Sequence, residues 1–239
     1  FEWKGVAITS ITMFVISSLL LINAPNNHKR LSHENLKQEW AECFSSLKNI
    51  AVIPQLLFAA IIGYLMMGPM QVILPQVAEQ QLGLSTIEKG QYLGLMAFSL
   101  IWGGIAAMKL KEHLPIGRSI LVMLFFCGAC LGLIGMIKTV WLSCLVLVIG
   151  TTLAGTVVSF IVAGLQQFTP AAIRGRVMSI YTIISQVVSA MAGVLAGALA
   201  QGVNVPFSLY VISALFIFLT LLLSIKGRIL KQFYHFRSA

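Results

Sequence analysis

The residues of this 239-residue chain that could carry chemistry are uncharged wherever the sequence is strongly apolar. Aspartate is absent, and the seven glutamates lie in polar segments or at the ends of apolar ones. The four histidines, His28, His33, His113 and His235, are scattered without the spacing of metal ligands. A proton relay at membrane depth needs a carboxylate or an imidazole there. The pattern therefore predicts no enzyme activity, no metal site and no cofactor.

Hydroxyl side chains within the apolar segments are candidates for contacting a small molecule. Two sets of three share one helix face each, at spacings of three and four residues. They are Thr152, Thr156 and Ser159 in one segment and Thr182, Ser185 and Ser189 in the next. Either face could line a cavity, or its hydroxyls could bond back to carbonyl groups of their own helix.

Tyr64 and Gln186 are further candidates because both lie well inside apolar segments, whereas Gln71 lies nearer an end. A phenol or an amide at that depth seeks a partner outside its own helix. The partner could be a molecule in a cavity, or it could be a neighbouring helix that the hydrogen bond holds in place.

These residues must be positioned by membrane-spanning helices. Hydrophobic residues make up 58% of the chain and charged residues 10%, and the mean hydropathy is +0.92, which excludes a soluble core. A span needs about 20 apolar residues. Seven segments qualify: Gly5 to Ala24, Ala51 to Leu74, Gln91 to Met108, Ser119 to Ile137, Val140 to Leu165, Met178 to Ala200 and Pro206 to Ile225. The predicted fold class is an all-α polytopic membrane protein with seven transmembrane helices.

The basic residues indicate the direction of these spans. Thirteen of the sixteen lysines and arginines fall in residues 25–50, 109–118, 166–177 and 226–239, which are alternate gaps between spans. Short loops rich in basic residues stay in the cytoplasm, so we expect the N-terminus outside and the C-terminus in the cytoplasm. A net charge of +9 distributed in this way argues against nucleic-acid binding.

Four parts follow along the chain. Residues 1–24 form a first transmembrane helix, and residues 25–50 form a cytoplasmic linker. Leu36, Trp40 and Phe44 recur at helical spacing in that linker and predict a short amphipathic helix. Residues 51–225 form a bundle of six helices, and residues 226–239 form a cytoplasmic tail.

Two of the basic loops have a more specific composition. The first reads GIAAMKLKEHLPIGR from Gly104 to Arg118, and the second reads TPAAIRGRVMS from Thr169 to Ser179. Both place basic residues beside glycine at a helix boundary, where they could bond the free carbonyls of a helix C-terminus and latch the cytoplasmic face. They could also serve only to set the topology.

These loops resemble those of the C-terminal half of a major facilitator superfamily transporter. The first resembles the loop motif that follows the second helix of each half of the family, and the second resembles the matching loop of enterobactin exporters. The residues that carry this resemblance, and that the family would use in cytoplasmic gating, are Gly104, Lys109, Gly117 and Arg118, followed by Arg174, Gly175 and Arg176.

The resemblance implies that the first span corresponds to the sixth helix of the family and that the other six form one half of the bundle. It implies a secondary active transporter in a bacterial inner membrane that exports a small molecule, drug-like or siderophore-like, by alternating access. The partners would be the lipid bilayer, the substrate and an N-terminal half missing from these residues. We expect that half to precede them.

Two other functions fit the same spans. A seven-helix receptor would share the predicted topology, although a retinal protein would need a lysine within a span, and none is present. A membrane scaffold would fold with a partner and would not respond to a substrate. The sequence upstream of Phe1 would distinguish them, because only the transporter requires about five further spans.

Overall fold

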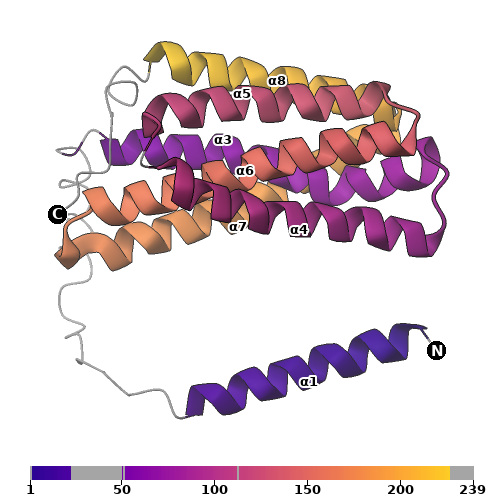
Figure 1. Cartoon of the computed structure of the whole chain (residues 1–239), viewed down its shortest axis with the longest axis horizontal. Helices are drawn as coiled ribbons and strands as arrows, with labels where there is room; N and C mark the ends of the chain where they lie inside the picture. The colour runs from indigo at the N-terminus through magenta and orange to yellow at the C-terminus, as the bar shows by residue number, and fades with distance from the viewer. Residues whose placement is uncertain (1, 23–49, 51, 112, 227–239) are drawn as a thin grey trace. The chain divides into compact units, whose positions relative to one another are not determined.

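The fold is built from helices. The computed structural model describes residues 2–22, 50, 52–111 and 113–226, and within them it contains no strand. Figure 1 shows the helices, which are α1 (Glu2–Ile22), α3 (Val52–Gln76), the π-helix η2 (Val77–Gln81), α4 (Thr86–Leu110), α5 (Ile116–Met136), α6 (Val140–Phe168), α7 (Ala171–Gly202) and α8 (Val205–Lys226). The predicted amphipathic helix of the linker and the C-terminal tail lie outside the described residues.

The predicted class of a polytopic all-α membrane protein is confirmed. Six helices, α3 with η2 and α4 to α8, are long and apolar enough to cross a membrane. Helix α1 has 21 residues, of which Ala7–Leu20 form a shorter apolar stretch. The chain divides into two compact units, residues 1–39 with α1 and residues 40–239 with the other helices, and the bundle formed by α3 to α8 is described by itself below.

Inside the bundle the helices associate in pairs through glycine. Helix α3 packs along α7, α4 along α6, and α5 against both α6 and α8. A Cβ atom on Gly68 of α3 would lie 2.7 Å from the backbone nitrogen of Gly193 in α7. One on Gly103 of α4 would lie 2.9 Å from the Cα atom of Gly155 in α6. Because glycine lets two backbones approach this closely, these residues define where the paired helices cross.

Two helix ends differ from those expected from the sequence. The predicted second span ends at Leu74, but α3 continues through Pro75 and passes into the π-helix that ends at Gln81. The amide of Leu82 bonds the carbonyl of Val77 at 3.0 Å and so closes that wider turn. Helix α7 begins at Ala171 rather than near Met178, because Pro170 occupies its N-cap position. Proline near a helix start leaves no amide unpaired there.

Several local contacts fix the connection between η2 and α4. Gly83 adopts a positive φ of 65°, which favours glycine. Ser85 then caps α4 in a capping box with Glu88, whose carboxylate accepts from the Ser85 amide at 2.8 Å. Lys89 forms an ion pair with Glu79 at 2.8 Å. These contacts hold the start of α4 against the end of η2.

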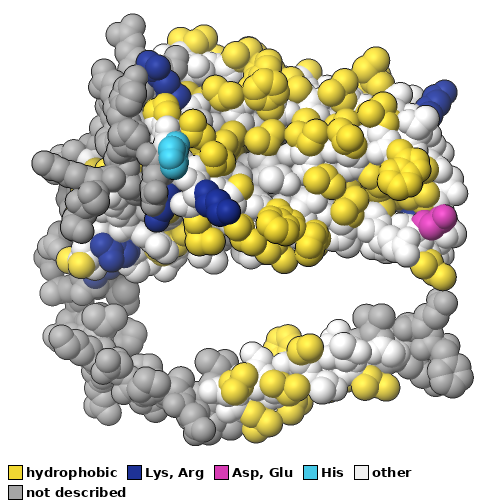
Figure 2. All heavy atoms as spheres, in the orientation of Figure 1, with side chains coloured by type: hydrophobic (Ala, Val, Ile, Leu, Met, Phe, Trp, Pro, Cys, Tyr) yellow, Lys and Arg dark blue, Asp and Glu magenta, His cyan; other side chains and the backbone are white. Residues whose placement is uncertain are grey.

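Burial differs strongly between the helices. In the most apolar stretch of each helix, 56% of the residues of α3 and of α5 are buried but only 17% of those of α4 and of α7. Helix α3 occupies the interior because it packs against α6 and α8 as well as α7. Figure 2 shows hydrophobic side chains along the sides of the bundle and most basic side chains at one end. Helices α4 and α7 therefore leave long faces that the bundle does not cover.

Candidate functional site

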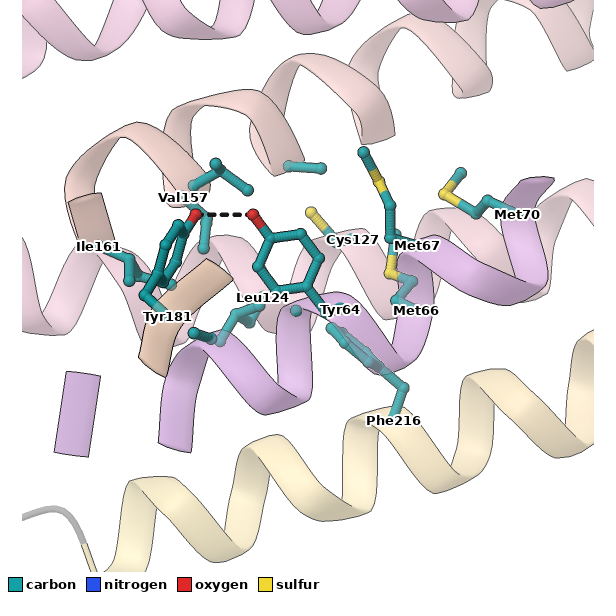
Figure 3. A pocket seen from close by; sticks show the side chains of 14 residues that line it. Tyr64, Met66, Met67, Met70, Leu124, Cys127, Val157, Ile161, Tyr181 and Phe216 are labelled. Atoms are coloured by element: carbon teal, nitrogen blue, oxygen red, sulfur yellow. Dashed lines mark hydrogen bonds between the residues drawn. The ribbon is translucent and has the colours of Figure 1, made fainter. Parts of the chain in front are cut away.

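A pair of tyrosines connects α3 and α7 at the centre of the bundle. The hydroxyl oxygens of Tyr64 and Tyr181 lie 2.6 Å apart, and their rings pack edge to face with centroids 5.8 Å apart. Figure 3 shows the two hydroxyl groups pointing toward each other from different helices. The pair carries two hydroxyl protons and uses one of them in the mutual hydrogen bond. The second proton remains available for a molecule that enters beside the pair.

The pair borders an internal cavity of about 20 Å³. Three methionines of α3, Met66, Met67 and Met70, line it together with Cys127 of α5. A volume of this size holds about one water molecule, and ligand pockets typically measure about 300–1,000 Å³. In this conformation the cavity is closed to a substrate. Methionine side chains adapt their shape easily, so this lining allows the cavity to widen when the helices move.

A larger and more polar groove follows the outer seam between α3 and α7. It has a volume of about 490 Å³ and is open along one side. Gln71 of α3 lies in it, opposite Ser189 and Gln201 of α7. Both glutamines are exposed. Their amide groups can donate and accept hydrogen bonds with any group that covers this seam.

Most of the candidate hydroxyls bond within their own helices. Ser159 donates to the carbonyl of Gly155 at 2.9 Å, Thr182 to that of Met178 at 2.9 Å, and Ser185 to that of Thr182 at 2.8 Å. Thr152 is half-buried on α6. Of the two uses left open by the sequence, these contacts favour bonding back to the helix.

Other hydroxyls hold helix pairs together. Thr156, which is buried, donates to the carbonyl of Gly103 across the contact of α4 with α6 at 3.0 Å. Ser213 of α8 donates to the carbonyl of Gly128 in α5 at 2.7 Å. Each of these hydrogen bonds gives a polar group a partner at a depth where water is absent, and so stabilises the pairing of the two helices.

The side chain of Gln186 is exposed on α7, as is that of Thr182. Thr182, four residues before it, and Ser189, three residues after it, lie on the same side of the helix and form a polar stripe with it, and Gln201 follows in the groove. The stripe continues into the groove formed with Gln71. Polar groups from Thr182 to Gln201 therefore border the seam of α7 with α3, beside exposed apolar side chains such as Val187 and Val194.

The basic loop residues occupy the opposite end of the bundle from η2. Arg174 lies in the first turns of α7 and donates to the carbonyl of Thr169, the C-cap residue of α6, at 3.3 and 3.4 Å. This contact is of the kind that the loop composition suggests, between a guanidinium and a free carbonyl at a helix C-terminus. Gly175 is exposed, and Arg176 is half-buried beside it.

In the other basic loop the residues fall on either side of a short turn. Lys109 is exposed in the last turn of α4, and Gly104 one turn earlier is half-buried. Gly117 is buried in the first turn of α5, whereas Arg118 beside it is exposed. Both loops therefore present basic side chains at the same end of the bundle.

The family model described as Major Facilitator Superfamily matches residues 1–193, which is most of the chain. The chain belongs to the Major Facilitator Superfamily. Its members are membrane transporters, so this chain is an integral membrane protein of a transporter family. No curated protein matches the chain.

Within this superfamily member, two site features are not predicted from the sequence patterns. Tyr181 carries the same signal as Tyr64, a phenol at membrane depth. Gln81 lies beyond the predicted end of its span, in η2. Its amide nitrogen donates to the carbonyls of Ile137 at 2.6 Å and Ile134 at 3.0 Å, and so caps the C-terminal end of α5.

Proposed function

We propose that these residues form the C-terminal half of a secondary active transporter that exports a small molecule by alternating access. The observation that carries the proposal is that polar side chains, Gln186 and Gln201 among them, are exposed along α7 between exposed apolar ones. Membership of the superfamily supports transport, and these polar side chains support a second body of protein, or water, beside α7.

Lipid is a poor environment for the two exposed glutamines of α7. Burying the amide groups of Gln186 and Gln201 in hydrocarbon without partners costs several kcal/mol each. Helix α8 offers the contrast. From Val211 to Ile225 all its exposed side chains are apolar, as expected of a helix that faces lipid.

Helix α4 supports the same interpretation through its small residues. Gly90 and Gly94 are exposed, and a Cβ atom on either would meet nothing within 4 Å. Glycines at helical spacing commonly mark a face that another transmembrane helix approaches. We propose that a second six-helix half covers α4 and α7 and that the substrate binds between the two halves.

The chemistry of the inner surfaces favours a neutral or amphipathic substrate, drug-like or siderophore-like. Among the described residues, the charged side chains of the bundle lie at its ends, and the interior offers the hydroxyls of Tyr64 and Tyr181. Arg174, Arg176 and Lys109 would then act as cytoplasmic gate residues. The proposed location is a bacterial inner membrane, with the C-terminus in the cytoplasm.

The test is efflux from proteoliposomes. We expect the complete protein to move a panel of neutral and amphipathic compounds across the membrane in response to an ion gradient. We expect residues 1–239 alone, reconstituted at the same density, to leave them in place, because one half cannot form a site that alternates between two sides. Sustained efflux by residues 1–239 alone would contradict the two-half proposal.

The receptor and scaffold hypotheses have less support. Neither accounts for the match to a transporter family over residues 1–193. Ligand binding by the complete protein without any transport of that ligand would restore the receptor hypothesis.

A further inference from the structure

A second groove of about 490 Å³ lies on the other side of α7, between α7 and α8 over a floor from α3. All its lining side chains are apolar. The ones that shape it are Pro69 on α3, Ala192, Ala196 and Leu199 on α7, and Leu215 and Phe216 on α8. No side chain in it can donate or accept a hydrogen bond.

The groove exists because α7 carries small residues where it faces α8. Ala192 and Ala196 are buried one turn apart, and Gly202 continues the row near the end of the helix. Helix α7 packs mainly on α3 and α8 mainly on α5, so the two helices make little contact with each other. Small side chains therefore leave a channel where larger ones would close the gap.

The length of the groove matches the length of one acyl chain in one leaflet of the bilayer. It follows α7 from Ala192 to Val203, which at about 1.5 Å per residue is close to 17 Å. One leaflet accounts for half of a hydrocarbon core of about 30 Å, which is about 15 Å and similar to the length of the groove. Since α7 and α8 both cross the membrane, the groove opens at hydrocarbon depth, next to the end where their connection lies.

We propose that this groove binds a single acyl chain of a bilayer phospholipid. An amphipathic substrate would leave its polar groups without partners there, whereas an acyl chain has none to satisfy. The bilayer also supplies acyl chains at high concentration at that depth.

The bound chain would contact the wall of the central cavity. Phe216 lines both spaces and is 3% exposed, so its ring separates the groove from the cavity beside Tyr64. The ring packs over Gly128 of α5, where a Cβ atom would lie 2.7 Å from the Phe216 Cδ1 atom. Figure 3 shows Phe216 reaching from α8 toward the cavity. An acyl chain in the groove supports this side chain from the lipid side.

The test is photolabelling of the complete protein in phosphatidylcholine vesicles that contain a phosphatidylcholine with a diazirine in one acyl chain. Mass spectrometry of the peptides should find several-fold more label at Leu199 and Leu215 than at Val122 and Phe126, which are exposed on α5 away from the groove. Equal labelling at both places would mean ordinary contact with surrounding lipid and would overturn the proposal.

Two variants make the test specific. Ala196→Leu fills the groove from its α7 wall, and Gly202→Leu fills its end, where a Cβ atom meets nothing within 4 Å and folding is not strained. Each should lower the label at Leu215 to the level found at Val122. The matched control is Ala200→Leu, on the same helix but outside the groove, which should retain the label.

Two results would count against the lipid. Undiminished labelling at Leu215 in Gly202→Leu would show that the chain does not occupy the groove. Displacement of the label by a transported compound, at the concentrations at which it is transported, would assign the groove to substrate instead. Neither result depends on whether the superfamily member exports or imports.

Discussion

A tyrosine hydroxyl in the middle of a membrane bundle has few partners, so the contact between Tyr64 and Tyr181 combines two roles. It satisfies two polar groups at depth, and it connects α3 to α7 through a bond that the arrival of another hydrogen-bonding group could replace. Tyr64 is half-buried and lines the cavity. In a transporter that alternates between conformations, an exchangeable bond of this kind permits helix movement at modest cost.

The strength of this bond can be measured by a double-mutant cycle. We expect Tyr64→Phe and Tyr181→Phe each to lower the stability of the complete protein by about 1 kcal/mol. The double variant should lose less than the sum, because both single changes break the same bond. Thermal unfolding in detergent is the measurement, with Tyr210→Phe, an exposed tyrosine of α8, as the control. Fully additive losses would show that the two hydroxyls are not coupled.

Gln186 is the residue on the open face of α7 whose change we expect to affect substrate choice. Gln186→Ala in the complete protein should shift the relative transport of hydrogen-bonding compounds by about three- to tenfold, the effect of one hydrogen bond. Transport of purely apolar compounds should stay as it was. Gln166→Ala, which removes an exposed amide near the C-terminal end of α6, is the matched control. An unchanged profile across the panel would remove Gln186 from the site.

The candidate site was predicted in part. A phenol at depth singled out Tyr64, but its partner lies 117 positions further along the chain, and no spacing rule connects the two. Spacing also put Thr156 on a face with Ser159 without showing that its hydroxyl reaches the carbonyl of Gly103 in another helix. Depth can be estimated from hydropathy, whereas a contact between helices depends on how they pair.

At the scale of the helices, glycine decides where pairs cross. The apolar segments and their order follow from hydropathy because a span must cover the hydrocarbon core. The pairing of α3 with α7 does not, since Gly68 and Gly193 belong to helices far apart in the chain and small residues also occur on open faces. The C-terminal end of α3 and the start of α7 differ from the predicted span ends for local reasons. These are a π-turn after Pro75 and a proline N-cap at Pro170.

Two glycines of α3 provide a matched test of this crossing. Gly68→Ala should destabilise the protein by about 1–3 kcal/mol, because the added methyl meets the backbone of Ser189 and Gly193. Gly63→Ala should be neutral or slightly stabilising, since its methyl meets nothing within 4 Å and alanine favours the helix. Thermal unfolding of both variants gives the comparison. Equal stability of the two would mean that α3 and α7 do not cross at Gly68.

At the scale of the whole molecule, the two ends of the bundle differ in charge and in construction. The helix ends that flank the connections from α4 to α5 and from α6 to α7 carry Lys109, Arg118, Arg174 and Arg176. At the opposite end, Lys89 and Glu79 form an ion pair in which the two charges cancel. Gln81 caps α5 there, so side-chain contacts hold the turns of this end in place. This asymmetry predicts that the basic end faces the cytoplasm, where positively charged loops are retained.

Cysteine labelling from outside the cell tests that orientation. In a variant of the complete protein without its native cysteines, Lys138→Cys lies in the connection from α5 to α6, at the end opposite the basic loops. A maleimide that cannot cross membranes should label it in intact cells. His113→Cys, exposed in the connection from α4 to α5, should react only after the membrane is permeabilised. The reverse result would place the basic loops outside, and Arg174 could then not belong to a cytoplasmic gate.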